Sequence, residues 1–303
     1  MKKLLVICGL TATGKTSLAF KLAKSFNGEL VSADSRQLYK KMDVGTGKEW
    51  GEVPIHGYDL AEPGENFSVS QYVAFTQKVI KKIYSRNKLP ILVGGTGLYI
   101  KAVVDGISTV DIPKNEDLRK TLTEKNILEL FEQLATLDSA KAASLNSSDK
   151  QNPRRLVRAI EVAIWKMENG SKHLSVVYEK QRYDTLFIGL KADSNLLDKR
   201  IGDRVEMRMN NGFIDEVEDL LKSGVSWKNQ SMKSIGYRES EKFLKSGLGY
   251  EDFIVEWIKS EKQYVKRQYT WFRKDTRINW FDISEQDYYK NVEILVKKWL
   301  NRS

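Results

Sequence analysis

The sequence predicts an α/β fold in which a parallel sheet is flanked by helices and interrupted by an all-helical insertion. Short apolar runs recur at 4–8, 28–33, 89–93 and 185–190, and segments with helical spacing separate them. Strands separated by helices of this length pair in parallel and are covered on both faces. Between about 113 and 182 the strand signal disappears and apolar residues recur only at helical spacing. The ligands of such a sheet gather at the carboxyl ends of its strands.

The first apolar run, 4–8, leads into Gly-Leu-Thr-Ala-Thr-Gly-Lys-Thr at 9–16. This octet fits the phosphate-binding pattern G-x-x-x-x-G-K-[S/T], and apolar residues at helical spacing follow it as far as Phe26. Backbone N–H groups and the helix dipole of such a loop hold phosphate oxygens, the lysine adds charge, and the hydroxyl at Thr16 can hold Mg²⁺. A P-loop NTPase-like sheet with a bound polyphosphate is therefore expected. The residues assigned to the phosphates are Gly9, Thr11, Ala12, Thr13, Gly14, Lys15 and Thr16.

The second strand, 28–33, ends at Asp34. Three roles are open to this carboxylate: a magnesium ligand, a general base, or the N-cap of a following helix. Ser35, Arg36 and Gln37 come next. Several polar side chains at one strand end favour a loop that contacts a substrate.

A helix around 69–84 precedes the third strand, 89–93, which ends in Gly-Gly-Thr-Gly at 94–97. An ATPase of this class carries a metal-binding carboxylate at such a strand end. Glycines instead allow close approach of the backbone, although they also suit a simple tight turn. Ordinary ATP hydrolysis is therefore disfavoured.

Two domains are expected. The catalytic core comprises 1–112 together with 184–303, including a fourth strand at 185–190 and a helical pattern from Ser194 onward. The helical insertion comprises 113–183.

The chain carries a formal net charge of +10, which suits a polyanionic partner such as nucleic acid but also suits a lysine-rich solvated surface. Arg154, Arg155 and Arg158 lie near the start of one helix, where the helix dipole prefers anions. Bases and aromatic residues also alternate over 262–274, which fits RNA contact or an amphipathic helix with an aromatic core stripe. The arginines favour RNA more strongly than the aromatic residues do.

The single cysteine, Cys8, and only two histidines leave metal chemistry to oxygen ligands, which suits Mg²⁺. No apolar stretch is long enough to span a membrane, and the chain enters its first strand without a signal peptide. We expect a cytoplasmic monomer with no membrane partner.

Six blocks of this sequence, in order along nearly the whole chain, resemble the tRNA dimethylallyltransferases. Such a set of matches is far more specific than the phosphate loop alone. The blocks are Gly9–Thr16, Ser32–Gln37, Gly94–Tyr99, Asn152–Arg155, Ile235–Glu239 and Lys266–Arg273.

The resemblance implies transfer of a dimethylallyl group from dimethylallyl diphosphate to N6 of the adenosine 3′ of the anticodon, in tRNAs that read codons beginning with U. The partners would be this diphosphate, with Mg²⁺ as cofactor, and the anticodon stem-loop of tRNA, clamped by the insertion. Asp34 matches the catalytic base, Thr11 and Lys15 lie at the reacting centre, and Arg204 is the candidate for contact with the diphosphate, with Arg200 and Arg208 as competitors. Matches to tRNA-contacting positions are Asp34, Ser35, Arg36, Gln37, Thr96, Arg119, Gln151, Asn152, Pro153, Arg154 and Arg155.

Two positions depart from the family pattern. Leu10 replaces a usual proline, and the lone Cys8 leaves no C-terminal zinc finger of the eukaryotic kind, so the compact bacterial form is expected. Three alternatives stay open: a small-molecule kinase, an isopentenyltransferase acting on free AMP, and an RNA-binding protein without catalysis. The kinase would consume ATP, the isopentenyltransferase would modify AMP, and the RNA-binding protein would bind tRNA without modifying it.

Overall fold

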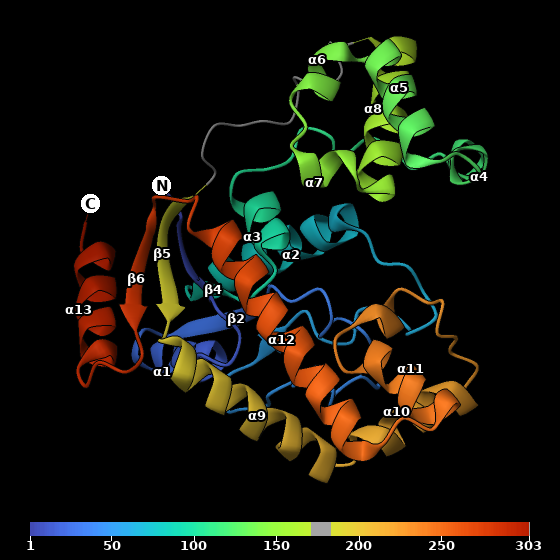
Figure 1. Cartoon of the computed structure of the whole chain (residues 1–303). Helices are drawn as coiled ribbons and strands as arrows, with labels where there is room; N and C mark the ends of the chain where they lie inside the picture. The colour runs from blue at the N-terminus through green and yellow to red at the C-terminus, as the bar shows by residue number, and fades with distance from the viewer. Residues whose placement is uncertain (171–182, 303) are drawn as a thin grey trace. The chain divides into compact units, whose positions relative to one another are not determined.

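The computed structural model describes residues 1–170 and 183–302 and divides the chain into two compact units (Figure 1). The first, the sheet unit, comprises Met1–Asp105 and Gln181–Ser303. The second, the helical unit, comprises Gly106–Lys180. Each unit has a hydrophobic core of its own.

The helical unit begins before the expected boundary at 113. Arg158 explains the difference, because its Nη2 donates hydrogen bonds to the carbonyl oxygens of Thr109 and Ile112 at 2.7 and 3.0 Å. These bonds attach the segment before 113 to the helical unit. The expected boundary at 183 adjoins residues 171–182, which lie outside the described ranges.

Within the described residues the sheet has six strands, all parallel, in the order β3-β2-β4-β1-β5-β6. The parallel α/β fold expected from the sequence is therefore confirmed. This order places β4 between β1 and β2, so the loops that follow these three strands lie at one edge of the sheet. The strands are β1 Lys3–Gly9, β2 Gly28–Ser32, β3 Ile55–His56, β4 Leu89–Val93, β5 Asp184–Lys191 and β6 Ile278–Asp282.

The two outer strands, β3 and β6, were not expected. The interpretation of everything beyond 194 as helical is wrong for β6, which pairs with β5. This strand has five residues, Ile-Asn-Trp-Phe-Asp, of which only Ile278 is buried, and it contains no continuous apolar run like those of the central strands. β3 has just two residues and is too short to produce a pattern.

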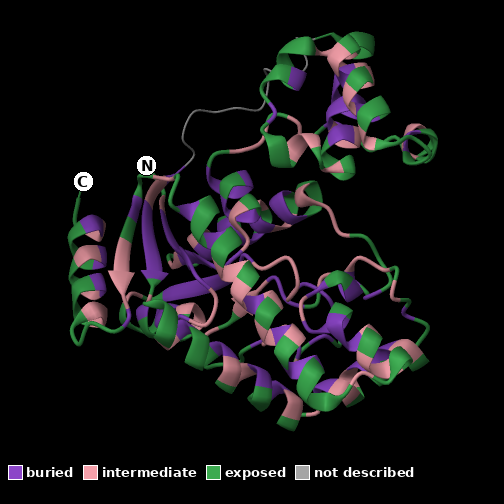
Figure 2. Cartoon of the chain, in the orientation of Figure 1, coloured by how far each residue is buried: buried purple, intermediate pink, exposed green. Residues whose placement is uncertain are grey.

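The core of the sheet unit lies between the strands and the helices α1, Lys15–Ser25, and α13, Tyr288–Leu300. Leu18 and Leu22 of α1 and Trp299 of α13 bury their side chains against the strands. Figure 2 shows the central strands in the colour of buried residues. Burial on both faces explains why these strands appear in the sequence as nearly continuous apolar runs.

The remaining helices of the sheet unit include the neighbouring pair α9 and α12 (Figure 1). An ion pair of 2.8 Å between Lys262 and Asp198 joins them. Farther along, Trp257 of α12 is fully buried against Phe213 of α10. The helices are α2 Val69–Ser85, α3 Gly97–Val104, α9 Ser194–Asn210, α10 Phe213–Lys222, η2 Ser231–Lys233, α11 Tyr237–Ser246 and α12 Tyr250–Phe272.

The helical unit packs its own core from leucine and isoleucine side chains. Leu130 and Leu134 meet Leu156 and Ile160, and all four are almost completely buried. Its expected helical character is seen throughout the described part of the unit. The helices are α4 Glu116–Thr123, α5 Ile127–Leu137, α6 Ser139–Ala143, α7 Ser147–Lys150 and α8 Pro153–Asn169.

None of the helices in the described ranges combines the length and the apolar character that a membrane span requires. The 23-residue helix α12 is long enough, but charged residues recur along it.

Candidate active site

The phosphate loop connects β1 to α1 and is anchored to the end of β5. Gly9 has a φ of +117°, and a Cβ at this position would lie 2.3 Å from the carbonyl oxygen of Leu190, so only glycine fits. The Leu10 N–H donates a hydrogen bond to the same oxygen at 3.1 Å. A proline at this position has no N–H, so the leucine gives the loop an anchor that proline cannot provide.

The loop is closed by its own side chains. Lys15 Nζ and Thr13 Oγ1 both donate to the Leu10 carbonyl oxygen, at 2.5 and 2.7 Å. Gly14 is the N-cap of α1 in a left-handed conformation, so no side chain caps this helix, and its first turn contains no acidic residue. The first N–H groups of α1 are therefore free of any side-chain cap, which favours an anion at this helix end.

Two arginines of α9 add positive charge beside the loop. Arg204 Nη2 lies 3.0 Å from Glu261 Oε2, and Arg208 Nη1 lies 3.3 Å from Glu261 Oε1. Two guanidinium groups therefore share one carboxylate. The Nε atoms of both arginines are buried and have no hydrogen-bond partner in the described part of the chain. This excess of cationic donors suits a polyanion.

The pKa values show the same excess of positive charge. Burial, followed by the nearby charge of Arg204, lowers the pKa of Lys15 to about 8. The same two causes lower the pKa of Arg208 to about 10. Of the three competing arginines, Arg200 is exposed and lies 3.4 Å from the Ala12 carbonyl oxygen through Nη1, whereas Arg204 acts directly on Lys15. A bound diphosphate would stabilise the charged forms of Lys15 and both inner arginines.

Asp34 follows β2 and begins a turn. Its Oδ1 accepts a hydrogen bond from the Arg36 N–H at 2.9 Å. The interpretation of Asp34 as a helix cap is wrong, because residues 35–38 form a turn. Ser35 N–H donates to Thr96 Oγ1 at 3.0 Å, so the loop after β4 supports the turn that carries Asp34. The expected site residues Asp34, Ser35 and Thr96 therefore lie together.

The side chains of Arg36 and Gln37 are held by other parts of the sheet unit. Arg36 Nη1 donates to the Gln230 carbonyl oxygen at 2.9 Å. Gln37 accepts from Ser32 Oγ at 2.9 Å and donates to the Gly47 carbonyl oxygen at 3.0 Å. These bonds fix the segment after Asp34 against its surroundings.

Thr16, the expected magnesium ligand, contacts a second oxygen donor. The carboxylate of Glu49 lies beside this hydroxyl; burial raises the pKa of Glu49, and the Thr16 hydroxyl and the charge of Lys15 lower it in part. No group of three or more His, Cys, Asp or Glu side chains suited to a metal occurs in the described residues. Mg²⁺ typically takes one or two protein oxygens and completes its shell with water and phosphate. Thr16 and Glu49 fit that kind of site.

In the helical unit the structure pairs most of the arginines internally. Arg119 makes two bonds to Glu161, of 2.9 and 2.8 Å, and Arg158 also contacts this carboxylate. Arg155 pairs with Asp149. Arg155 and Arg158 therefore each have an acidic partner within the chain, and their contact with an external anion stays a prediction.

The other RNA-contact candidates of this unit lie at the start of α8. Asn152 caps the helix, accepting from the Arg155 N–H at 3.3 Å, and Pro153 occupies its first turn. Gln151 and Arg154 are exposed, and Arg154 forms no ion pair in the described residues. Arg154 is therefore the arginine in this cluster whose charge is available to a ligand.

Comparison with known proteins agrees with this geometry. The model of the IPP transferase family matches residues 37–275. The chain belongs to the IPP transferase family. A model described as isopentenyl transferase also matches residues 2–53. The resemblance stated from the six sequence blocks is thereby confirmed.

Relatives of this IPP transferase family member match nearly the whole of this chain. A tRNA dimethylallyltransferase of Halothermothrix orenii is 40% identical over 307 residues, which cover 97% of this chain and 92% of the relative. A full-length tRNA isopentenylpyrophosphate transferase of Bacillus halodurans has a TM-score of 0.74 at 33% identity, covering 99% and 97% of the two chains. A eukaryotic dimethylallyltransferase acting on tRNA has a TM-score of 0.85 at 25% identity, covering 100% of this chain and 81% of that one.

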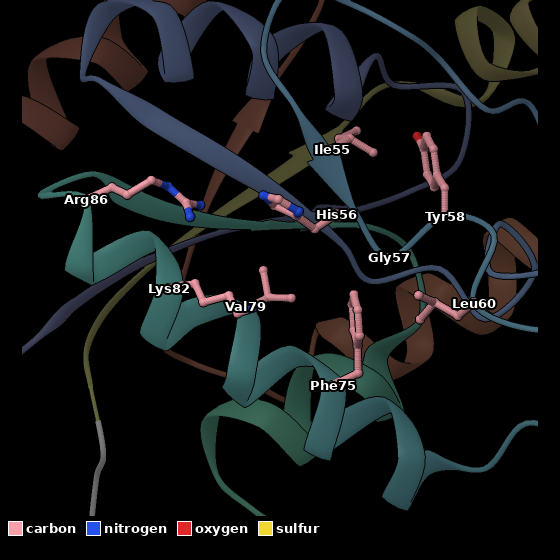
Figure 3. Close-up of a pocket in the computed structure, with 9 residues that line it drawn as sticks. All are labelled: Ile55, His56, Gly57, Tyr58, Leu60, Phe75, Val79, Lys82 and Arg86. Carbon is pink, nitrogen blue, oxygen red and sulfur yellow. The ribbon is translucent and has the colours of Figure 1, made fainter.

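A pocket of about 520 Å³ lies between β3 and α2 (Figure 3). Two of its side chains are held by buried Glu29, which binds Arg86 at 2.6 Å and His56 at 2.9 Å. Only Lys82 among its cations lacks a partner in the described residues. Its lining residues are Ile55, His56, Gly57, Tyr58, Leu60, Phe75, Val79, Lys82 and Arg86.

Sequence reasoning missed three groups of the IPP transferase site. Glu49 lies in an irregular segment with no periodicity, and Glu261 and Gln268 belong to α12, far from the loop in sequence. Within the basic and aromatic stretch 262–274, Gln268 is buried and Trp271 is 42% exposed. The signal that would have identified Glu261 and Gln268 is a polar residue at the helical spacing of the apolar face of α12, because such a residue is buried and needs a polar partner.

Proposed function

We propose that this chain transfers the dimethylallyl group of dimethylallyl diphosphate to N6 of the adenosine 3′ of the anticodon in tRNAs that read codons beginning with U. Family membership and relatives named tRNA dimethylallyltransferase support the reaction class. One observation carries the proposal: the cationic phosphate loop follows β1, the carboxylate of Asp34 follows β2, and both lie at the same edge of the sheet. One loop holds the leaving diphosphate, and the other receives the nucleophile.

The proposed reaction is a single displacement. The N6 amine attacks the allylic carbon, the carbon–oxygen bond to diphosphate breaks, and its electron pair leaves with the diphosphate. Asp34 accepts the N6 proton as general base. Its Oδ1 is oriented by the Arg36 N–H, and the Oδ2 atom forms no hydrogen bond in the described residues and is left for the amine.

Charge that develops on the departing diphosphate meets Lys15, Arg204 and Arg208. Donors already in place before the reaction stabilise such charge without reorganisation. Mg²⁺, when bound through Thr16 and Glu49, supplies further neutralisation of the phosphate oxygens. Thr11 lies next to the reacting carbon and contacts the substrate.

The adenosine must leave the stack of the anticodon loop before its N6 can be reached. We propose that Ser35, Arg36, Gln37 and Thr96 contact the extruded nucleotide. The helical unit binds RNA phosphate through Arg154, with Gln151 beside it. Phosphate contacts supply affinity, and unpaired bases supply sequence choice.

The deciding experiment offers the protein radiolabelled dimethylallyl diphosphate with unmodified tRNA, with AMP, or with no acceptor. Label is expected in tRNA alone, at the adenosine 3′ of the anticodon, and only in tRNAs reading codons that begin with U. Equal labelling of AMP would identify a free-nucleotide transferase. Absence of label from every acceptor, despite tRNA binding, would identify an RNA-binding protein without catalysis. ATP consumption without transfer would identify a kinase.

A further inference from the structure

The side chain of Gln268, on α12, is buried at 3% exposure between two loops of the site. Its Oε1 accepts the backbone N–H of Thr11 at 2.7 Å. Its Nε2 donates to the Gly95 carbonyl oxygen at 3.1 Å. Both ends of the amide are therefore occupied by backbone groups from two different segments.

These two segments are the ones that carry the proposed chemistry. Thr11 belongs to the phosphate loop. Gly95 belongs to the loop after β4, where Thr96 accepts the N–H of Ser35 at 3.0 Å, next to Asp34. Backbone bonds already join these segments, since Gly94 N–H donates to the Ile7 carbonyl oxygen and Thr96 N–H donates to the Ala33 carbonyl oxygen, both at 3.0 Å. Gln268 adds a side-chain link beyond the ends of the strands, from the phosphate loop itself to Gly95.

The contact is tight and has further support. The hydroxyl of Tyr264, one helical turn earlier on α12, donates to the same Gly95 oxygen at 3.1 Å. A Cβ at Gly95 would lie 2.2 Å from Gln268 Nε2, so the amide occupies the space that any larger residue at 95 would need. An apolar side chain at 268 would fill the volume but leave the Thr11 N–H without this acceptor, and the Gly95 oxygen would keep only the bond from Tyr264.

We propose that Gln268 is a positioning residue that holds the phosphate loop and the Asp34 turn at the separation the reaction needs. The inference rests on the proposed function. The allylic carbon lies on a substrate held by one loop, and the amine is oriented by the other. Reacting atoms must approach to about 3–3.5 Å, and a misplacement of about 1 Å can lower the rate about 100-fold.

The test compares Gln268→Met, Gln268→Glu and the matched control Gln263→Met. Methionine keeps the length of the side chain but removes both hydrogen bonds. Glutamate keeps an acceptor for Thr11 but removes the donor to Gly95. Gln263 lies on the same helix, is exposed, and forms no side-chain hydrogen bond in the described residues.

In Gln268→Met, kcat is expected to fall about 10- to 100-fold, while the Kd for tRNA stays within about threefold. Gln268→Glu should lie between Gln268→Met and wild type, and Gln263→Met should match wild type. Amide hydrogen exchange in 9–14 and 94–97 should accelerate in Gln268→Met, with the thermal midpoint of each variant measured alongside.

A wild-type kcat in folded Gln268→Met would overturn the inference. A loss of activity that is fully explained by the fraction of unfolded protein would overturn it as well. If Gln268→Met does not fold, the comparison of Gln268→Glu with wild type decides, and an unchanged kcat there overturns the inference. Failure of the proposed function is distinguishable, because the wild-type protein would then transfer no label to tRNA.

Discussion

Asp34 shows how two oxygens of one carboxylate can have different tasks. Oδ1 is held by the Arg36 N–H at 2.9 Å, which orients the group. The turn is held in its own right by the bond from Ser35 to Thr96. A substitution that keeps the shape of Asp34 should therefore test its chemistry without disturbing its position.

Asp34→Asn is expected to reduce turnover by about 100- to 10,000-fold, because an amide does not accept the N6 proton. The Kd for tRNA should stay near wild type. The measurement is single-turnover transfer from labelled dimethylallyl diphosphate together with filter binding of tRNA. Asp203→Asn, an exposed position on α9, is the control and should behave as wild type. Normal turnover at saturation in Asp34→Asn would remove this residue from the role of base.

Lys15 offers a second prediction, since burial and Arg204 lower its pKa to about 8 in the free protein. A bound diphosphate raises that pKa again. Below about pH 8 the lysine is charged before and after binding, so binding takes up no proton from the medium there. Above it, the free protein loses this charge, and binding of the diphosphate must take up a proton.

Affinity for dimethylallyl diphosphate should therefore fall as the pH rises above about 8, with proton uptake approaching about one per site near pH 9. Titration calorimetry in two buffers of different ionisation enthalpy measures this uptake. Lys15→Arg should abolish it, because arginine stays charged throughout. Affinity that is independent of pH in the wild type would contradict the assignment.

At the scale of elements, helices after β5 hold the irregular segment that follows β2. Glu216 of α10 accepts three consecutive backbone N–H groups, from Asp43, Val44 and Gly45, at 2.7, 2.8 and 3.0 Å. The Tyr237 hydroxyl donates to the same carboxylate at 2.5 Å. One side chain on a helix therefore replaces the regular partners that this segment lacks, and the segment leads directly to Glu49.

Glu216→Ala is expected to lower the free energy of unfolding by about 2–4 kcal/mol, because four donors lose a charged acceptor. Glu218→Ala, on the same helix, removes only an exposed pair with Lys222 at 3.7 Å and should change stability by less than about 0.5 kcal/mol. Urea denaturation measures both. Equal effects of the two substitutions would show that the segment is held by other contacts.

At the scale of the whole molecule, each unit contains a buried glutamate that joins cations from separate elements. Glu29 serves this purpose in the sheet unit, and Glu161 serves it in the helical unit. Burial alone would raise the pKa of Glu161, but hydrogen bonds from Arg119, Asn115 and Arg158 outweigh burial and lower the pKa to about 2. The folded value lies below the ordinary one, so this stabilisation is present above about pH 4.5 and is lost as the pH falls towards 2.

Glu161→Gln should therefore destabilise the helical unit by about 3 kcal/mol at pH 7. It should also reduce the loss of stability of this unit as the pH falls below about 4.5. Because the two units have separate cores, protection of the strands should stay unchanged. Hydrogen exchange resolved by peptide, over 116–169 and over the strands, measures the two effects separately. Glu132→Gln, exposed on α5, is the control. Uniform loss of protection in both units would show that they unfold as one.

The sequence by itself determined the parallel α/β class, the phosphate loop and the family, because each rests on short stretches whose own residue order carries the pattern. A strand, a glycine turn and a helix start leave a local pattern at 4–26 that is readable without a structure. The edge strand β6 leaves no such pattern, since its five residues, Ile-Asn-Trp-Phe-Asp, form no continuous apolar run.

Only the tertiary structure decided which charges meet. From α12, Glu261 pairs with Arg204 of α9 and Gln268 bonds to Thr11 of the loop, and Glu49 lies beside Thr16 from an irregular segment. It also showed that Arg119 is paired with Glu161. The physical reason is that hydrogen bonds and ion pairs depend on distances of about 3 Å in space, and contacts between elements far apart in the chain impose no spacing on the sequence.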